Sequence, residues 1–487
     1  MSGIAGLIRL DCAPLDSHCL HRALAVLARR GPDRQRSVVD DNAAFGQTLL
    51  ATTPEALNEV QPWTHPDSGC TIVADSRLDN RPELLQQLGL RDRHVDSIGD
   101  AELLHAAWQR WGEACPIRLL GDFAFAIWNP RTQSLFCARD PMGVRQLLYC
   151  HLPGQLFAFA TEADALLRMA GVPHTLNEGR IADVILDLEG IDHASTMFEA
   201  IARLPGAHIL SVDQSTRRIT RYWTPTDDLV DTQYTRDEDY AEAMRGHLAQ
   251  AVHCRLRSND VVGSMLSGGL DSSAIAALAS LEMQHATGAS LPSFSTVDRS
   301  QPCPETGAVD AMLAQSGFVS HPFDVADSDA DWATLAAEQE RLLEPFDWGM
   351  GLLRAHYLSA NRVGVRAMLD GIDADGLFNS GNFHRRLMRS GRWDVLWQEV
   401  QGQSRFHNGL FSTLSLTRSD LAQVLVPQWL LLARARLQAP RRLRRRLCDA
   451  LISSEFATRA CVQERIGRLV AGRGYPAGAD RQSERVL

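Results

Sequence analysis

Short apolar runs separated by polar turns dominate the first third of the chain, and they predict β-strands. Two longer segments place apolar residues three and four positions apart, which indicates amphipathic helices at residues 20–28 and 101–111. Strands and helices mixed in this way predict a layered α+β domain over residues 1–165. The predicted strands cover residues 2–10, 70–74, 121–128, 134–137 and 156–160.

The pattern changes twice after residue 165. Pro173, a polar segment around Asn177 and a stretch rich in Pro, Asp and Thr at 223–235 predict a connecting region over residues 166–236. From residue 237 to residue 487, helical segments alternate with buried strands, which predicts an α/β domain with a parallel sheet. Its predicted strands are 261–266, 293–297 and 365–369.

The turn that follows the strand at 261–266 carries the strongest candidate chemistry. Its sequence is Ser-Gly-Gly-Leu-Asp-Ser-Ser at 267–273, and residues 274–278 are predicted to begin a helix. Glycines let the backbone close around an anion, the helix N-terminus offers N–H donors, and Asp271 can hold a metal that bridges phosphate oxygens. The turn therefore predicts a pyrophosphate site without the lysine of a Walker loop. The predicted nucleotide-binding residues are Leu266, Ser267, Gly268, Gly269, Asp271, Ser272 and Ser273.

Composition restricts the class of protein. Of the 487 residues, 45% are hydrophobic and 22% are charged, as expected for a soluble globular protein. The formal net charge of −10 argues against general nucleic-acid binding, and no apolar run is long enough to span a membrane. The ten cysteines form no Cys-x-x-Cys pair and no signal peptide is indicated, so we expect a cytoplasmic protein with reduced thiols.

Further segments, in order along the chain, carry a resemblance to a known family. They are Ser-Gly-Ile-Ala-Gly at 2–6, Arg-Gly-Pro-Asp at 30–33, the strand at 121–128, Ala-Arg-Asp-Pro-Met-Gly-Val-Arg at 138–145 and Leu-Asp-Gly-Ile-Asp-Ala-Asp-Gly-Leu-Phe at 369–378. With the turn at 267–273 they resemble asparagine synthetase (glutamine-hydrolysing) and its relatives. The resemblance implies an N-terminal-nucleophile hydrolase-like domain of the type 2 glutamine amidotransferases, layered α/β/β/α. An ATP-pyrophosphatase domain, adenine nucleotide alpha hydrolase-like, would follow it.

The residues that would hydrolyse glutamine depart from the family pattern. The family's N-terminal cysteine attacks the amide of glutamine with its own α-amine as base, and here Ser2 stands at that position. The arginine that binds the glutamine carboxylate falls at Leu49, and an acceptor glutamate falls at Arg77. Only Asp100 keeps the family's appearance. Without the arginine, glutamine loses charge-assisted hydrogen bonds worth about 1.5–3 kcal/mol each, so we expect a scaffold that is inactive as a glutaminase.

For the ATP domain, the resemblance implies Gly371 near the ribose or α-phosphate and Asp375 beside Asp271 as the second ligand of Mg²⁺. It also implies a two-step reaction. A substrate carboxylate attacks the α-phosphate of ATP to give an acyl-adenylate and pyrophosphate, and an amine then displaces AMP. The family glutamate expected near this amine falls at Ile372, so Asp373 is the candidate for the general base.

The end of the chain departs from the family as well. The family's synthetase domain normally continues further and supplies a lysine, whereas all 49 basic residues here are arginine. An arginine-rich run at 434–446 predicts a solvated helix face, with a binding patch as the alternative. The site is then completed differently or by a partner, or the chain is a truncated paralogue.

Relatives that share the loss of the glutaminase site are amide synthetases whose nucleophile comes from the substrate itself. Segments 52–55 and 78–84 are most similar to those of lasso-peptide macrolactam synthetases. The favoured hypothesis is an ATP-dependent amide ligase in which the α-amine of a peptide precursor attacks an activated Asp or Glu side chain, with a cysteine-protease-like maturation partner. One alternative is an asparagine synthetase acting on a small amino acid with glutamine or free ammonia. The other is a non-catalytic ATP- or peptide-binding paralogue.

Overall fold

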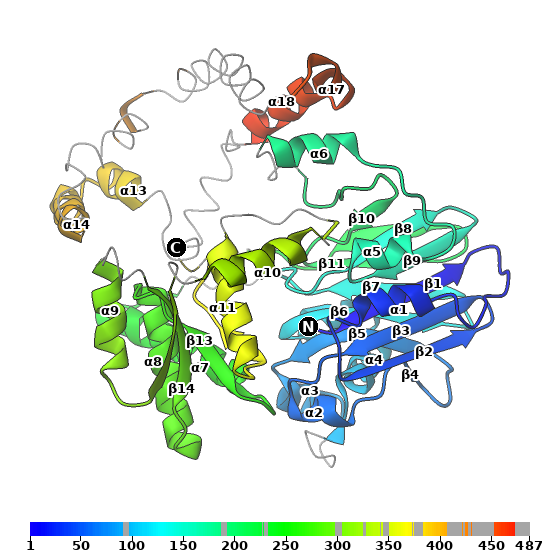
Figure 1. Ribbon diagram of the computed structural model, residues 1–487, viewed down its shortest axis with the longest axis horizontal. Helices are drawn as coiled ribbons and strands as arrows, with labels where there is room; N and C mark the ends of the chain where they lie inside the picture. The colour runs from blue at the N-terminus through cyan, green and yellow to red at the C-terminus, as the bar shows by residue number, and fades with distance from the viewer. Residues whose placement is uncertain are drawn as a thin grey trace. The chain divides into compact units, whose positions relative to one another are not determined.

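A computed structural model describes most of the chain (Figure 1). The described residues form two compact units. The first runs from Met1 to Ile181 and from Asp192 to Asp370, and the second contains residues 182–186 and those described from Gly371 onward. The described residues are 1–90, 97–186, 192–225, 227, 232–297, 304–324, 328–340, 342–343, 350–372, 374, 383–406, 421, 424–426, 430 and 452–472.

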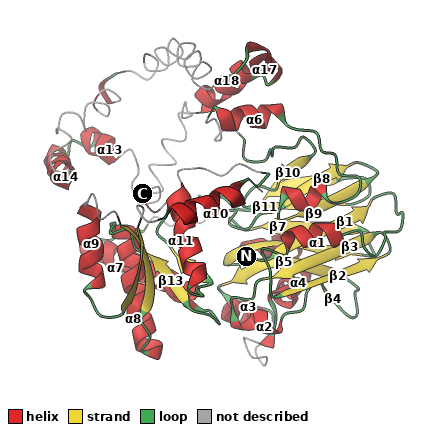
Figure 2. Ribbon diagram, viewed as in Figure 1, coloured by secondary structure: helices red, strands yellow, loops and turns green. Residues whose placement is uncertain are grey.

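The first unit begins with two six-stranded antiparallel sheets, shown as yellow arrows in Figure 2. One sheet has the strand order β10-β8-β9-β1-β3-β2. Its strands β1 (Gly3–Arg9), β3 (Ala43–Leu49) and β9 (Leu156–Ala160) are almost wholly buried. Helices α1 (His21–Leu27) and α5 (Ala163–Leu167) pack on its outer face. The remaining strands of this sheet are β2 (Arg34–Asp40), β8 (Leu148–Leu152) and β10 (Ile201–Arg203).

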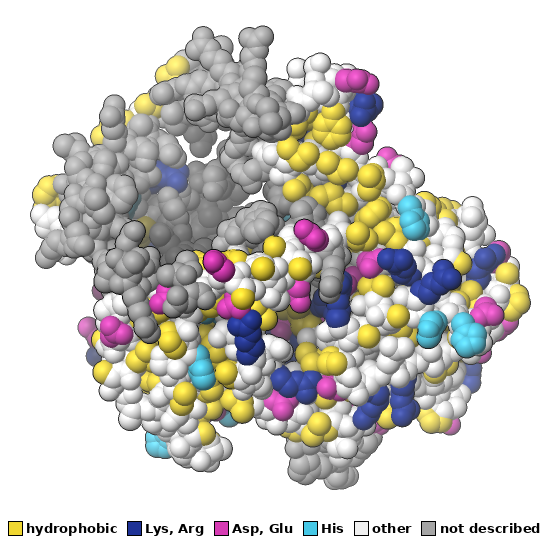
Figure 3. Space-filling model, in the orientation of Figure 1, with side chains coloured by type: hydrophobic (Ala, Val, Ile, Leu, Met, Phe, Trp, Pro, Cys, Tyr) yellow, Lys and Arg dark blue, Asp and Glu magenta, His cyan; other side chains and the backbone are white. Residues whose placement is uncertain are grey.

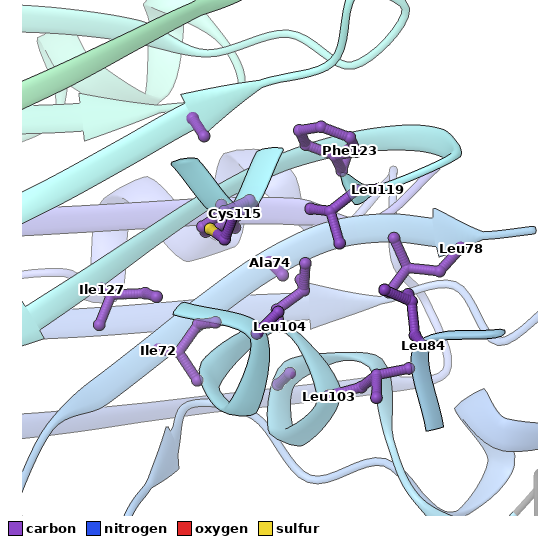
Figure 4. Packing of buried hydrophobic residues seen from close by; sticks show 14 of the residues in the cluster. Ile72, Ala74, Leu78, Leu84, Leu103, Leu104, Cys115, Leu119, Phe123 and Ile127 are labelled. Carbon is purple, nitrogen blue, oxygen red and sulfur yellow. The ribbon is translucent and has the colours of Figure 1, made fainter. Parts of the chain in front are cut away.

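The other antiparallel sheet has the strand order β12-β11-β7-β6-β5-β4. Helices α3 (Arg81–Gln87) and α4 (Asp100–Trp111) and the 3₁₀ helix η2 (Gly112–Arg118) cover its outer face. Figure 4 shows Ile72 and Phe123 of this sheet within the apolar cluster that also contains helix residues such as Leu104. Its strands are β4 (Trp63–Thr64), β5 (Thr71–Leu78), β6 (Gly121–Asn129), β7 (Ser134–Arg139), β11 (His208–Val212) and β12 (Arg217–Arg221).

A second apolar cluster lies between the two sheets. Ile4 and Phe45 contribute from one sheet, and Val73 and Trp128 contribute from the other. Side chains alternate between the two faces of a strand, so the central strands bury one face against the other sheet and the other face against helices. The resulting order of helix, sheet, sheet and helix confirms the predicted α/β/β/α fold. The predicted connection also contributes strands β10, β11 and β12 to the two sheets.

The third sheet is four-stranded and parallel, in the order β15-β14-β13-β16, which confirms the second part of the fold prediction. Its strands are β13 (Val262–Met265), β14 (Leu291–Val297), β15 (Phe318–Asp324) and β16 (Ala367–Leu369). Helix α7 (Asp237–Leu256) precedes β13, and α8 (Leu270–Thr287) connects β13 to β14. The later connections contain α9 (Pro304–Leu313), α10 (Asp329–Gln339) and α11 (Gly351–Arg362). The pattern did not reveal β15, because the apolar residues of this edge strand are interrupted by Ser320, His321 and Pro322.

The second unit is helical in its described residues. Leu387 and Met388 of α13 (Phe383–Arg389) pack against Leu396 and Val400 of α14 (Trp393–Phe406). The unit also contains α17 (Ser454–Arg459) and α18 (Val462–Gly472), together with the end of α6 (Glu178–Ile185). The arginine-rich run at 434–446 lies outside the described residues.

Three general properties follow for the part of the chain that is described. None of its helices combines the length and the apolar character needed to cross a membrane. Its cysteines are free thiols. On the face shown in Figure 3, arginine side chains lie among acidic side chains. The absence of a nucleic-acid partner stays a prediction.

Candidate functional site

The Ser-Gly-Gly turn lies at the carboxyl end of β13, where ligands bind in open parallel sheets. The Leu266 N–H donates to the Phe294 carbonyl at 2.8 Å, which extends the pairing with β14 to the start of the turn. Helix α8 begins at Leu270, earlier than the predicted 274–278, so Asp271 lies in its first turn. The turn therefore leads directly into a helix N-terminus, which favours bound anions.

Two serines shape this turn. The hydroxyls of Ser267 and Ser272 lie 2.9 Å apart, and the Ser267 N–H donates to the Ser272 hydroxyl at 3.2 Å. The Ser267 hydroxyl in turn accepts the Gly269 N–H at 3.3 Å. Ser272 is buried and Ser267 is exposed. Ser272 thus fixes the shape of the turn, while Ser267 remains open to a ligand.

Gly268 has a conformation that other residues rarely adopt. Its φ is +83°, and a Cβ atom there would lie 2.6 Å from the backbone carbonyl oxygen of Glu305 in α9. The close contact is with backbone, so a side chain at this position cannot be accommodated by a rotamer change. A glycine is required here by both the torsion angle and the neighbour.

The other predicted residues of the nucleotide site are only partly described. Asp271 is half-buried in the first turn of α8. Gly371 belongs to the second unit, while Asp373 and Asp375 lie outside the described residues. Within the described ranges, no group of three His, Cys, Asp or Glu side chains could hold a metal ion. Asp271 is therefore the one predicted Mg²⁺ ligand whose position is described.

Two side-chain pairs at the carboxyl ends of β14 and β16 escaped the sequence analysis. Tyr357 Oη donates to Asp370 Oδ2 at 3.3 Å, and burial with the nearby carboxylate raises the pKa of Tyr357 to about 12. Thr296 Oγ1 lies 2.9 Å from Nε2 of His356, whose pKa burial lowers to about 4. Of these four residues, only Asp370 lies in a motif, the segment at 369–378, and the sequence analysis gave it no role. The position of Asp370 directly after a predicted strand was the available signal.

Ser2, at the position of the family nucleophile, is buried directly before β1. Its backbone N–H donates to Asp75 Oδ1 at 3.1 Å, and its hydroxyl accepts the Leu50 N–H at 3.0 Å. Arg145 lies 3.6 Å from the same oxygen of Asp75. The hydroxyl of Ser2 is thus held by the residue that follows β3, and its backbone by a buried carboxylate of β5.

The two positions that depart from the glutamine pocket have other partners. Leu49 packs with Ala51 and Ala56 in a small apolar cluster. Arg77 is 7% exposed, and its Nη2 donates to the carbonyl oxygens of Cys254 at 2.6 Å and Arg257 at 2.9 Å. Desolvation on burial lowers the pKa of Arg77. The side chain that replaces the family glutamate therefore binds the end of α7.

Asp100, the expected remnant of the glutamine pocket, is the first residue of α4 and is 2% exposed. It forms an ion pair with Arg81, which is 1% exposed, and its Oδ2 accepts the Ser76 hydroxyl at 3.1 Å. The carboxylate expected in the glutamine pocket is therefore already paired with a buried cation. Burial is the main cause that raises the pKa of Asp100.

Glu59 lies beside this ion pair and is itself buried. Its Oε1 accepts the Ala101 N–H at 2.7 Å and the Gln61 Nε2–H at 2.9 Å. Burial, assisted by the negative charge of Asp100, raises the pKa of Glu59 to about 8. Sequence reasoning missed this group, because a single glutamate after a short helix has no distinguishing pattern.

Comparison with known families accounts for both parts of the chain. The family of the glutamine amidotransferase domain matches residues 1–223, and that of asparagine synthase matches residues 243–480. The two matches follow the order of the antiparallel and parallel sheets. The chain belongs to the asparagine synthetase family.

Individual relatives support the same assignment at low identity. Asparagine synthetase (glutamine-hydrolyzing) 2 of Bacillus subtilis is 28% identical over 289 residues, covering 57% of this chain and 38% of that protein. Asparagine synthetase (glutamine-hydrolyzing) 3 of the same organism is 29% identical over 287 residues, covering 57% and 45%. Amidase chyE of Penicillium rubens is 26% identical over 270 residues, covering 55% and 39%. The matches span less than half the length of each of these relatives.

Proposed function

We propose that this member of the asparagine synthetase family is an ATP-dependent carbon–nitrogen ligase whose nitrogen does not come from glutamine. The turn at 267–273 binds the phosphates of ATP. A substrate carboxylate attacks the α-phosphate and pyrophosphate leaves, and an amine then attacks the acyl-adenylate carbonyl, loses a proton and displaces AMP. Asp271 and Asp375 would hold Mg²⁺, which supplies neutralisation of the pyrophosphate charge.

The buried pair of Asp100 and Arg81 is the observation that carries the exclusion of glutamine. An ammonium group that entered the pocket would have to displace a guanidinium that is 1% exposed. Removing one member of a buried ion pair costs about 3–5 kcal/mol. Leu49 offers no compensating contact to the glutamine carboxylate. Glutamine binding would therefore begin with a large penalty and gain little in return.

The finer proposal is that the carboxylate and the amine belong to one peptide and that the product is a macrolactam. Its support is the similarity of segments 52–55 and 78–84 to lasso-peptide macrolactam synthetases. An asparagine synthetase that acts on aspartate fits equally well with the named B. subtilis relatives. Both functions begin with the attack of a carboxylate on ATP, which releases pyrophosphate. They differ in the acid that carries this carboxylate, a peptide or aspartate.

The test is pyrophosphate release by the purified full chain with ATP and Mg²⁺. The acids to compare are L-aspartate with ammonium, L-aspartate with L-glutamine, and a peptide with a free α-amine and an internal Asp or Glu. We expect release with the peptide and a product one water lighter by mass spectrometry. Release with aspartate and ammonium alone would favour the asparagine synthetase. Glutamate formation from glutamine would refute the proposal on nitrogen source, and no release with any acid would favour a non-catalytic paralogue.

An Asp271→Asn variant serves as the matched control for this assay. It keeps the size of the side chain and removes the charge that Mg²⁺ requires. Pyrophosphate release should fall by at least about tenfold. Unchanged release would mean that the activity arises elsewhere.

A further inference from the structure

The segment between α7 and β13, the strand that ends at the nucleotide turn, is bound to the amidotransferase-like domain. We define the docking segment as residues 254–260, which run from the end of α7 to the residues just before β13. Arg77 Nη2 donates to two of its carbonyl oxygens, those of Cys254 and Arg257. The last carbonyls of a helix lack partners within the helix, and a cation there is favourable. Arg77 therefore caps α7 from another domain.

The arginines of the docking segment bind the same domain in return. Arg255 makes a two-pronged ion pair with Asp122 of β6. Arg257 pairs with Glu55 of α2 (Pro54–Asn58) and donates to the Leu78 carbonyl at 2.6 Å. Glu55 is 1% exposed, so this pair is sheltered from solvent. Burial makes such contacts costly to break from one side.

The residues that follow extend the attachment to the start of β13. The Ser258 hydroxyl and the Asn259 N–H both donate to the Thr52 carbonyl, at 3.0 and 3.2 Å. Arg366, directly before β16, donates to Asp33 Oδ2 at 2.5 Å and lies 3.5 Å from Asp260. Val262 of β13 pairs with Ala367 of β16. The amino ends of two neighbouring strands are therefore fixed to one surface.

Polar contacts to the amidotransferase-like domain run along the docking segment from Cys254 to Asn259. A cavity of about 350 Å³ lies beside the carboxyl end of the segment. Its lining includes Asp33, Asn259, Asp260 and Arg366, which make the contacts described above. The charged contacts at Arg77, Arg255 and Arg257 are the ones whose loss should loosen the docking segment.

One short buried strand connects the docking segment to the nucleotide turn. Only Val261, the strand β13 and Leu266 separate residue 260 from Ser267. The strand is buried over its whole length, and interiors that are close-packed transmit displacement. We propose that Arg77 is a positioning residue for the ATP turn. Arg77 stands where the family resemblance places a glutamate of the glutamine pocket. Here its side chain connects the amidotransferase-like domain to the segment that positions the ATP turn.

The inference rests on the proposed nucleotide site for its consequence, but not for its test. The variant is R77E in the full chain, with R218E as the matched control. Arg218 is an exposed arginine of the same domain that pairs with Glu113. Amide hydrogen exchange followed by mass spectrometry reports peptides covering 254–260, 267–273 and, as an internal standard, 121–129. Affinity for the non-cleavable analogue α,β-methylene-ATP with Mg²⁺ is measured by calorimetry.

We expect R77E to accelerate exchange about tenfold in both 254–260 and 267–273 and to leave 121–129 unchanged. Nucleotide affinity should fall by a similar factor, and R218E should match the wild type in every readout. The inference is overturned if 267–273 exchanges as in the wild type while 254–260 is loosened. If the wild-type protein binds no nucleotide, the proposed function is refuted. The effect of R77E on amide exchange at 267–273 would still decide whether Arg77 positions the turn.

A conservative variant covers the case in which R77E does not fold. R77K keeps the charge, but a single ammonium cannot bind the Cys254 and Arg257 carbonyls and also replace the contact of Arg77 Nε with Asp79 Oδ1 at 3.3 Å. Its exchange rates should lie between those of the wild type and R77E. Wild-type exchange at 267–273 in R77K, with faster exchange at 254–260, would also overturn the proposal.

Discussion

Arg81 and Asp100 form an ion pair in which both side chains are almost completely removed from solvent. The guanidinium also donates to the Ile98 carbonyl, and the carboxylate accepts the Ser76 hydroxyl. Each charge therefore has several partners inside the domain. The pair links the first turn of α3 to the first turn of α4. The pair makes Asp100, a residue predicted to lie in the glutamine pocket, part of the folded core.

Removing the cation from this pair should destabilise the protein strongly. Arg81→Met leaves Asp100 buried without its main partner, and we expect a loss of about 3–5 kcal/mol in the free energy of unfolding. Arg168→Met is the control, because Arg168 is 55% exposed and its pair with Asp164 at 3.0 Å should contribute less than about 1 kcal/mol. Urea unfolding followed by near-UV circular dichroism measures both. Equal losses in the two variants would show that the buried pair stabilises the protein no more than the exposed pair does.

Restoring the nucleophile alone should not restore glutamine hydrolysis. Ser2→Cys supplies a thiol at the start of β1, but Asp100 stays bound to Arg81 and position 49 still lacks a cation. We expect glutamate release from glutamine to stay at the background rate of a Ser2→Ala variant. A coupled glutamate dehydrogenase assay makes the comparison. Release that rises with Ser2→Cys would mean that the pocket still accepts glutamine.

The sequence pattern was sufficient for the elements whose apolar residues decide their structure. Strands β1, β6 and β9 are buried on both faces, so each appears as an apolar run. Strand β12 has no such signal, because all five of its residues are exposed. It forms through backbone hydrogen bonds with β11, and pairing of that kind leaves no trace in side-chain hydrophobicity.

The candidate site divides in the same way. The nucleotide turn is contiguous, and its glycines and serines are needed at fixed spacing, so the sequence locates it. One partner of Arg77, the carbonyl of Cys254, is 177 positions away in the chain. The substitution at residue 77 predicted the loss of a ligand contact, but local pattern contains nothing about the new one. Contacts of this kind become visible only when the fold brings the two segments together.

The buried carboxyl of Glu59 should give stability a distinct pH dependence. Its pKa is raised from 4.5 to about 8 in the folded protein, so folded chains keep this proton over a range in which unfolded chains have lost it. The contribution of Glu59 to stability is therefore present below about pH 4.5 and is lost as pH rises towards 8. Glu59→Gln keeps the Oε1 acceptor and cannot ionise. Relative to the wild type, it should gain several degrees in melting temperature between pH 5 and pH 8.

The matched control for Glu59 is Glu83→Gln, at an exposed position of α3. Its melting temperature should follow that of the wild type at every pH, because the carboxylate is solvated in both states. Scanning calorimetry at pH 5, 6.5 and 8 measures the three proteins. Parallel curves for the wild type and Glu59→Gln would contradict the assignment of a raised pKa.

Replacing Gly268 should disturb the nucleotide turn more than the torsional strain of a left-handed residue alone would. Gly268→Ala introduces strain at φ +83° and places a Cβ 2.6 Å from the Glu305 carbonyl oxygen. Gly288, at the end of α8, also has a positive φ, +71°, but no atom lies within 4 Å of the position that a Cβ would take there. Gly288→Ala therefore carries only the cost of the torsion angle, about 1–2 kcal/mol. We expect Gly268→Ala to weaken binding of α,β-methylene-ATP by at least about tenfold, because the turn must move to relieve the contact. Gly288→Ala should lower the melting temperature and leave nucleotide affinity within about twofold of the wild type. If both variants bind nucleotide equally well, the turn does not hold the phosphates.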